Sequence, residues 1–298
     1  MKSILYSLLA LSLILTSCSE KKTPGGVKYV VLKKGDGQAP EAGKYLSMSL
    51  LMKDSKDSVW FDSKTVGGTI IVPVPDSTME KDPGEMGVFK VLTKGDSIRF
   101  SLTALTVFMK TRHIPVPQNI DSASLFTFTA CLKDVMSRDE VNEYQQKMAM
   151  KSQREQVQKD SVAIENFLKE KGIVAKTTES GVRYVVKKEG TGPLAVAGQT
   201  ALVHYAGYTL DGKLFDTSWA SVAKENNFNN GDRNEPYPVV INTRSVIQGW
   251  DDMLQLMNKG MKVTVYIPSS LAYGPQSPGP EIPPNAILMF DMEVMDIQ

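Results

Sequence analysis

Cysteine and histidine are scarce in this chain, which has two of each among 298 residues. So few thiol and imidazole side chains cannot supply a zinc cluster, and a metal site would have to rest on carboxylates. Charge of one sign is also lacking, because 34 Lys and Arg residues balance 33 Asp and Glu residues, for a formal net charge of +1. A nearly neutral chain has no strong field to attract nucleic acid. We therefore expect no metal, no other cofactor and no nucleic-acid partner.

The sequence also lacks the common motifs of covalent and phosphate chemistry. It contains no G-x-S-x-G, G-x-x-x-x-G-K-[ST] or H-E-x-x-H segment. The two histidines are far apart, and His204 alternates with Val203 and Tyr205 as in a strand. A lone strand histidine is more often a hydrogen-bonded structural residue than a catalyst. If this protein is an enzyme, its reaction needs no covalent intermediate.

The first residues have the pattern of a leader. Lys2 precedes an apolar stretch from Ile4 to Leu15, which is too short to span a bilayer. The stretch ends in small residues before Cys18 and resembles the bacterial lipoprotein signal. That resemblance implies lipidation of Cys18, which would become the new N-terminus on a membrane; the alternative is an ordinary secretory signal. Cys131 then has no intramolecular partner and is expected to be a small buried residue of a strand.

Two parts of the chain are similar in sequence. Residues 26–37, GVKYVVLKKGDG, match residues 181–192, GVRYVVKKEGTG, at eight of twelve positions. The matches continue in order, for example Phe61-Asp62 with Phe215-Asp216. Ordered matches over such a distance favour two copies of one fold. The expected organisation is a leader at 1–17, a tether at 18–25, a first copy at 26–137, a helical linker at 138–173 and a second copy at 174–298.

The linker has the signals of a helix. Ser137 and Glu140 can form a capping box, and neither proline nor glycine occurs from Arg138 until Gly172. Apolar residues recur at helical spacing on a charged background, which is typical of one packed face. Lys159-Asp160-Ser161 could break the helix in two. A dimerising helix, and hence a homodimer, is the alternative to a spacer, although no sustained heptad is present.

Strand patterns dominate the second copy. Apolar residues alternate with polar ones from Met261 to Ile267 and from Leu288 to Val294, the period of a sheet with one covered face. A short helical stretch from Trp250 to Met257 lies between them. The architecture expected is α+β, with an antiparallel sheet packed on a small helix.

Aromatic residues and prolines surround a few polar groups in this copy. The segments are, in order, VHYAGY at 203–208, GKLFDTS at 212–218, DRNEPY at 232–237, VIQGW at 246–250, LAYG at 271–274, IPPNA at 282–286 and LMFD at 288–291. Together, over residues 181–298, they resemble the FKBP family of peptidyl-prolyl cis/trans isomerases. The resemblance implies two FKBP-like domains and an isomerase that assists the folding of exported proteins in a bacterial envelope. It also implies proline-containing polypeptides as partners and macrolides of the FKBP class as candidate inhibitors.

The resemblance also implies a proline pocket. Tyr205, Asp216 and Tyr273 would be its catalytic residues, with Asp216 hydrogen-bonded to a neighbouring tyrosine or amide. Trp250 would be the floor under the proline ring, and the backbone N–H of Ile247 would hold a substrate carbonyl together with the Tyr273 hydroxyl. The substrate-binding residues would be Phe215, Tyr237, Val246, Ile247, Trp250, Ile282 and Phe290. Residues 219–230 are an insertion, either a solvated loop or a specificity flap.

The first copy differs from this pocket at several positions, although Asp62 is retained where the second copy has Asp216. Leu50 aligns with Tyr205, and Glu85 with Trp250. A charged floor would remove the apolar platform, so we expect this copy to keep the fold with little isomerase activity. The competing hypothesis for the whole chain is a chaperone or scaffold that binds proline or unfolded chain without turning it over.

Overall fold

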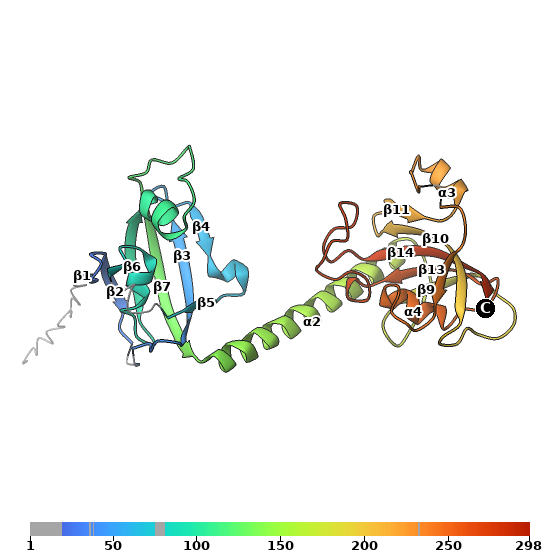
Figure 1. Cartoon of the computed structure of the whole chain (residues 1–298), viewed down its shortest axis with the longest axis horizontal. Helices are drawn as coiled ribbons and strands as arrows, with labels where there is room; N and C mark the ends of the chain where they lie inside the picture. The colour runs from blue at the N-terminus through green and yellow to red at the C-terminus, as the bar shows by residue number, and fades with distance from the viewer. Residues whose placement is uncertain (1–19, 36, 38, 75–80, 232) are drawn as a thin grey trace, which may run out of the picture. The chain divides into compact units, whose positions relative to one another are not determined.

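The computed structural model describes residues 20–35, 37, 39–74, 81–231 and 233–298. The leader expected at 1–17 and the lipidation residue Cys18 lie outside the described residues. The described chain forms two compact units that divide within one long helix, between Gln146 and Lys147 (Figure 1). No helix in these ranges has the length and apolarity needed to cross a membrane.

The first unit is an antiparallel sheet of seven strands with short helices. Its strands run in the order β1-β2-β6-β7-β3-β4, and β5 pairs with β3. In chain order the elements are β1 (Glu20–Lys22), β2 (Lys28–Lys33), β3 (Tyr45–Lys53), β4 (Val59–Asp62), η1 (Ser63–Val66), β5 (Ile70–Pro73), α1 (Glu85–Phe89), β6 (Ser97–Thr103), the π-helix η3 (Thr106–Thr111) and β7 (Leu125–Met136). Strand β1 falls in the segment expected as a tether, and Cys131 lies half-buried in β7.

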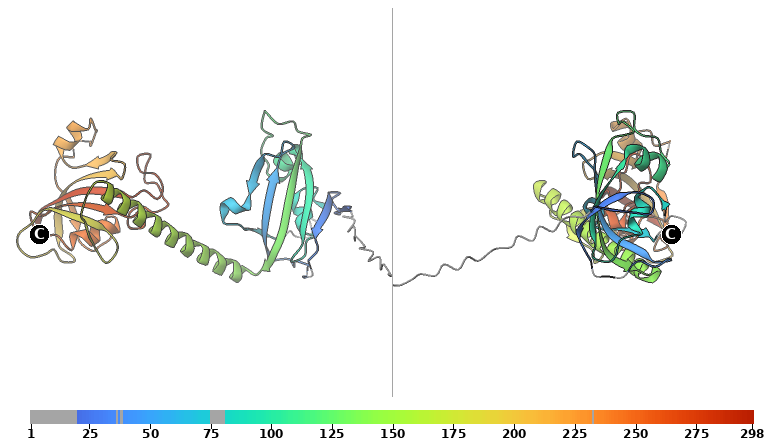
Figure 2. Two further views of the ribbon diagram at one scale, coloured as in Figure 1. Left: turned by 180° about the vertical axis from the view of Figure 1, so that it is seen from behind. Right: turned by 90° about the vertical axis from the view of Figure 1, so that its left-hand side faces the viewer.

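The second unit repeats this arrangement. Its strands run in the order β8-β9-β13-β14-β10-β11, and β12 pairs with β10. The left view of Figure 2 shows this unit, coloured yellow to red, from behind. The elements are β8 (Lys176–Thr177), β9 (Arg183–Lys188), β10 (Thr200–Thr209), β11 (Leu214–Thr217), α3 (Ala220–Glu225), β12 (Tyr237–Val240), α4 (Gln248–Leu254), β13 (Lys262–Ile267), η4 (Ser269–Leu271) and β14 (Leu288–Ile297). The expected insertion at 219–230 therefore contains a short helix.

The two sheets agree in register as well as in order. Met52 of β3 pairs with Phe128 of β7, and Gly207 of β10 pairs with Phe290 of β14 at the equivalent place. The α+β architecture of two antiparallel sheets, predicted from the strand pattern and the internal repeat, is thus confirmed.

Alternation along β13 positions the floor of the site. Val263, Val265 and Ile267 are fully buried and face a core that includes α4. Helix α4 begins two residues earlier and ends three residues earlier than the stretch predicted from Trp250 to Met257. Met257 is nonetheless fully buried in the turn that follows the helix. The helix is short, and burial of one face against the sheet holds it in place.

One continuous helix, α2 (Arg138–Glu170), connects the two sheets. The capping box at its start is confirmed, since Ser137 N donates to Glu140 Oε2 at 2.6 Å and Glu140 N donates to Ser137 Oγ at 3.2 Å. The break considered at 159–161 does not occur. Asp160 is 2% exposed and hydrogen-bonded, so its polarity is satisfied by tertiary contacts and the helix is not interrupted there.

Candidate functional site

A cavity of about 210 Å³ opens in the second unit. It lies at the N-terminal end of α4 and is bordered by residues of β10, β11 and β14. It is smaller than the roughly 300–1,000 Å³ of pockets that enclose drug-sized ligands. The cavity is lined by Tyr205, Phe215, Asp216, Tyr237, Ser245, Val246, Ile247, Trp250, Tyr273 and Phe290. Nine of these residues were predicted from the sequence, and Ser245 was not. A space of this size suits a single ring.

Trp250 is held in place by other aromatic rings. Its ring centroid lies 5.0 Å from that of Tyr205 and 5.2 Å from that of Phe290, both edge to face. The indole Nε1 is buried without an acceptor among the described residues, so packing fixes the ring. Gly249 lets α4 approach β13, because a Cβ there would lie 2.4 Å from Ile267 Cγ2. The floor therefore depends on a glycine next to the tryptophan.

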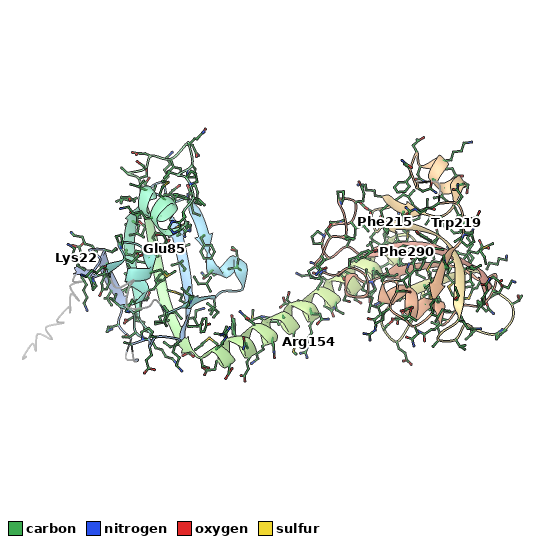
Figure 3. All side chains as sticks on the ribbon, viewed as in Figure 1. Lys22, Glu85, Arg154, Phe215, Trp219 and Phe290 are labelled. Atoms are coloured by element: carbon green, nitrogen blue, oxygen red, sulfur yellow. The ribbon has the colours of Figure 1, made fainter. Side chains whose placement is uncertain are left out.

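Phe215 and Phe290 form one side of the cavity. They lie on β11 and β14, and their ring centroids are 5.6 Å apart at an interplanar angle of 88° (Figure 3). The backbone of Gly207 on β10 passes beneath both rings. A Cβ on Gly207 would lie 2.6 Å from Phe290 and 2.7 Å from Phe215, so a side chain there would displace the rings.

Asp216 is the charged group of the site. Tyr205 Oη donates to Asp216 Oδ2 at 2.8 Å, which is the tyrosine bond expected from the sequence. Arg233 Nη2 donates to Asp216 Oδ1 at 2.7 Å, and Thr217 N to the same oxygen at 3.0 Å. Burial, together with the bond to Asp216, raises the pKa of Tyr205 well above its usual value, so the phenol stays protonated and donates. The carboxylate is thus paired on both oxygens.

Sequence reasoning assigned no role to Arg233. The available signal was chemical, since a carboxylate among aromatic rings requires a positive or hydrogen-bonding partner. Arg233 lies in the loop that follows the insertion, and the sequence does not reveal where that loop passes. Its distance from Asp216 along the chain, 17 residues, conceals the pairing.

Two donors expected for substrate carbonyls border the cavity. Tyr273 is 41% exposed. Partial burial of its side chain, together with the nearby negative charge of Asp216, raises the pKa of Tyr273. Its hydroxyl therefore remains a donor at neutral pH. Ile247 precedes α4, and within the described ranges its backbone N–H has no acceptor. Both groups can bind a ligand without breaking an internal bond.

Ile282 is placed differently from the other predicted residues. It is 7% exposed and lines an adjoining depression of about 290 Å³, which shares Phe215, Asp216 and Tyr273 with the cavity. Glu281, next to it, forms an ion pair with Lys213. The depression extends the cavity toward the 278–282 loop.

The expected floor position of the first unit carries a buried charge. Glu85 is 6% exposed at the start of α1 and pairs with Arg112 Nη2 at 3.0 Å. Burial raises the pKa of Glu85 against the opposing effect of Arg112. Phe108, which the internal repeat places near the position of Tyr273, is buried and packs against Phe126 and the half-exposed Trp60. An ion pair and packed rings therefore stand where the second unit has its apolar floor and hydroxyl.

His204 has the structural environment expected of it. Its Nδ1 lies 2.9 Å from Ser218 Oγ, and its ring stacks on Trp219 with centroids 5.8 Å apart. Ser218 Oγ in turn accepts a bond from Tyr205 N at 2.8 Å. The histidine supports the strand and lies outside the residues that line the cavity.

Residues 192–295 match the sequence model of a family described as FKBP-type peptidyl-prolyl cis-trans isomerase. Among curated proteins, the chain is 39% identical over 127 residues to a "Probable FKBP-type peptidyl-prolyl cis-trans isomerase" of Haemophilus influenzae, covering 43% of this chain and 47% of that one. It is 37% identical over 158 residues to the isomerase FkpA of Aeromonas hydrophila, covering 53% of each. The chain thus spans about half the length of the curated relatives it matches.

Solved structures include a crystal structure of FkpA from Escherichia coli. It is 32% identical to this chain, covers 56% of it and 75% of its own length, and superposes with a TM-score of 0.38.

Proposed function

Residues 192–295 form a domain of the FKBP-type peptidyl-prolyl cis-trans isomerase family, and from this premise we propose that the whole chain accelerates cis/trans isomerisation of Xaa-Pro bonds in polypeptides. The observation that carries the proposal is the cavity over Trp250, whose size suits one proline ring. The substrates proposed are proline-containing unfolded or exported chains, whose folding can wait tens of seconds on a single bond.

The reaction makes and breaks no covalent bond. Resonance gives the amide C–N bond a rotational barrier near ~18–20 kcal/mol, while the two Xaa-Pro isomers differ by only ~0.5–1 kcal/mol. The planar amide is more charge-separated than the twisted one, so an apolar aromatic cavity favours the twisted bond relative to water. Only binding that is stronger for the twisted bond increases the rate.

The residues of the cavity divide this task. The proline ring rests on Trp250, between Tyr205 and the pair Phe215 and Phe290. The Tyr273 hydroxyl and the Ile247 N–H donate to the carbonyls that flank the bond, and so hold the backbone while the bond turns. Asp216, fixed by Tyr205 and Arg233, places negative charge at the side of the cavity.

The location proposed is the bacterial cell envelope. The leader pattern supports export, and Cys18 supports a lipid anchor that holds the second unit near newly exported chains. Mass spectrometry of the mature protein tests this directly. An acylated Cys18 at the N-terminus is the expected species, and a free N-terminus downstream of Cys18 would contradict it.

Exchange NMR on an Xaa-Pro peptide tests the activity. We expect the full chain to broaden the cis and trans proline signals at catalytic concentration, and Tyr273→Phe to lower kcat/KM because one carbonyl donor is lost. Equal rates for the wild-type chain and the variant would mean that the site is misplaced. Peptide binding without faster exchange would remove the isomerase proposal.

Binding of unfolded chain is the second candidate function, and the first unit favours it. Large apolar side chains are exposed around η3 and the start of β7, where Trp60 contacts Phe108 at 5.8 Å between centroids. The exposed residues are Trp60, Leu105, Met109, Ile114 and Leu125. Exposed apolar groups of this kind mark interaction sites. The same NMR titration separates this function, since it predicts binding without isomerisation.

A further inference from the structure

Helix α2 places one buried carboxylate against the second unit. Asp160 Oδ2 accepts hydrogen bonds from Ser269 N at 2.8 Å and from Ser269 Oγ at 2.6 Å. Its other oxygen accepts from Gln156 Nε2 at 2.7 Å. Asp160 is 2% exposed and Ser269 is fully buried. A carboxylate removed from water is costly unless both oxygens are bonded, so these contacts hold each other in place.

Ser269 in turn fixes the segment that carries Tyr273. Its carbonyl oxygen accepts hydrogen bonds from Ala272 N at 3.0 Å and from Gly274 N at 2.8 Å, on either side of the tyrosine. The carbonyl of Gly274 accepts from Asn285 N at 2.7 Å, which ties the segment to the chain after Ile282. Asp160 therefore lies at the start of a short chain of bonds that ends at the backbone N–H groups of Ala272 and Gly274, the two neighbours of Tyr273.

The helix on which Asp160 lies is itself packed on this unit. Ile164 and Leu168 are buried against Tyr266 of β13, the strand that leads directly into Pro268 and Ser269. Arg183 Nη2 of β9 contacts Ser161 Oγ at 2.8 Å and Glu165 Oε1 at 3.1 Å. The buried packing of Ile164 and Leu168, in the two turns that follow Asp160, keeps the carboxylate at a fixed distance from the turn at Ser269.

We propose that Asp160 of the connecting helix is a positioning residue of the isomerase site, acting through Ser269 to hold the Tyr273 hydroxyl where a substrate carbonyl meets it. The proposal rests on the proposed isomerase activity. It makes the second half of α2 part of the active domain, although the sequence pattern describes a linker. Small errors of position are costly in such a site, because the donor has to meet a carbonyl at hydrogen-bond distance.

The test uses the full chain with Asp160→Asn, which keeps the shape of the side chain and removes its charge. We expect kcat/KM to fall on the order of tenfold, less than the roughly 100-fold that a 1 Å misplacement can cost. The matched control is Glu165→Gln, on the same helix, whose partner Arg183 is not bonded to the 269–274 segment. It is expected to leave kcat/KM within about twofold of wild type, the scale of an exposed ion pair.

A double-mutant cycle separates positioning from general loss of structure. If Asp160 acts through Tyr273, Asp160→Asn costs little further rate in a Tyr273→Ala background, since the effects of residues in one hydrogen-bond network are not additive. The same fold loss in both backgrounds would overturn the proposal.

Fluorine NMR provides a readout that does not depend on activity. With 3-fluorotyrosine incorporated, the Tyr273 signal is assigned by its loss in Tyr273→Phe and is expected to shift or broaden in Asp160→Asn. An unmoved signal would overturn the positioning role. If the wild-type chain shows no isomerisation, the proposed function fails while this signal still decides whether Asp160 orders the segment. Should Asp160→Asn not fold, Ser269→Ala removes only the hydroxyl bond and is expected to move the same signal.

Discussion

At the scale of single residues, the clearest difference between the two units is that the first buries a carboxylate, Glu85, where the second buries an aromatic ring. Glu85 occupies the position where the second unit has Trp250, and its carboxylate is covered by protein while Arg112 is one-third exposed. Burial raises its pKa above the ordinary value of 4.5. The stability that its proton contributes is fully present below that ordinary value, and it is lost as the pH rises through the raised value in the folded state.

Glu85→Gln is therefore expected to gain stability relative to the wild-type chain as the pH rises from about 4.5 toward neutrality. Glutamine has no proton to lose, so the difference grows through this window and then levels. Urea denaturation followed by amide NMR signals of the first unit measures it. Glu140→Gln is the control of opposite sign, because hydrogen bonds from Ser137 lower the pKa of Glu140 and its contribution is lost as the pH falls. A difference that does not vary with pH would contradict the assignment.

At the scale of elements, the contact between α4 and β13 sets the height of the cavity floor. Gly249→Ala would bring a Cβ to 2.4 Å from the side chain of Ile267 on β13, which is fully buried. Alanine gains about 1 kcal/mol of helix propensity over glycine. Overpacking costs typically ~1–3 kcal/mol, so we expect a net loss of stability together with weaker peptide binding as Trp250 moves.

Thermal or urea unfolding of the second unit, with peptide titration, measures both effects. Gln248→Ala is the matched control, since it adds the same alanine to an exposed position of the same helix. A Gly249→Ala chain more stable than wild type would show that α4 has room to move, and that the close approach of α4 to β13 does not require a glycine.

Much of this element-level picture is present in the sequence, and particular residues show where it ends. Alternation from Met261 to Ile267 predicts β13 and its buried face, because strand periodicity is local. Asp160 and Ser269 are 109 residues apart, and no local pattern indicates that they meet. The pairing of Arg233 with Asp216 is hidden for the same reason, since an insertion of uncertain path lies between them. Local sequence patterns therefore predict the elements, whereas hydrogen bonds between residues far apart in the chain are seen only in the folded structure.

At the scale of the whole molecule, the same fold occurs twice and only the second unit has the residues proposed for isomerisation. Asp62 and Asp216 are matched by the internal repeat and differ in surroundings. Asp216 is bonded to Tyr205 and Arg233, whereas Asp62 accepts from the backbone of Lys64 at 2.9 Å and caps a helical turn. Equivalent carboxylates thus line a cavity in one unit and cap a helical turn in the other.

Asp216→Ala in the full chain is expected to lower kcat/KM on the order of tenfold, equivalent to about 1.4 kcal/mol. Asp62→Ala is expected to leave the rate unchanged, with at most the ~0.5–2 kcal/mol loss of stability typical of a removed helix cap. Exchange NMR and urea denaturation of both variants measure the two effects. Equal loss of rate in the two variants would show that the first unit contributes to turnover.

The outermost strands of both sheets share one more property. Among the described residues, β1 and β8 have three and two residues, and β4, β5, β11 and β12 have four each. Long exposed strand edges act as templates on which other chains add as further strands and aggregate. These short borders, with Pro73 and Pro238 on two of them, offer few free amide and carbonyl groups to such chains. If the chain acts on partly folded polypeptides as proposed, these borders allow it to stay dispersed among them without pairing with their strands.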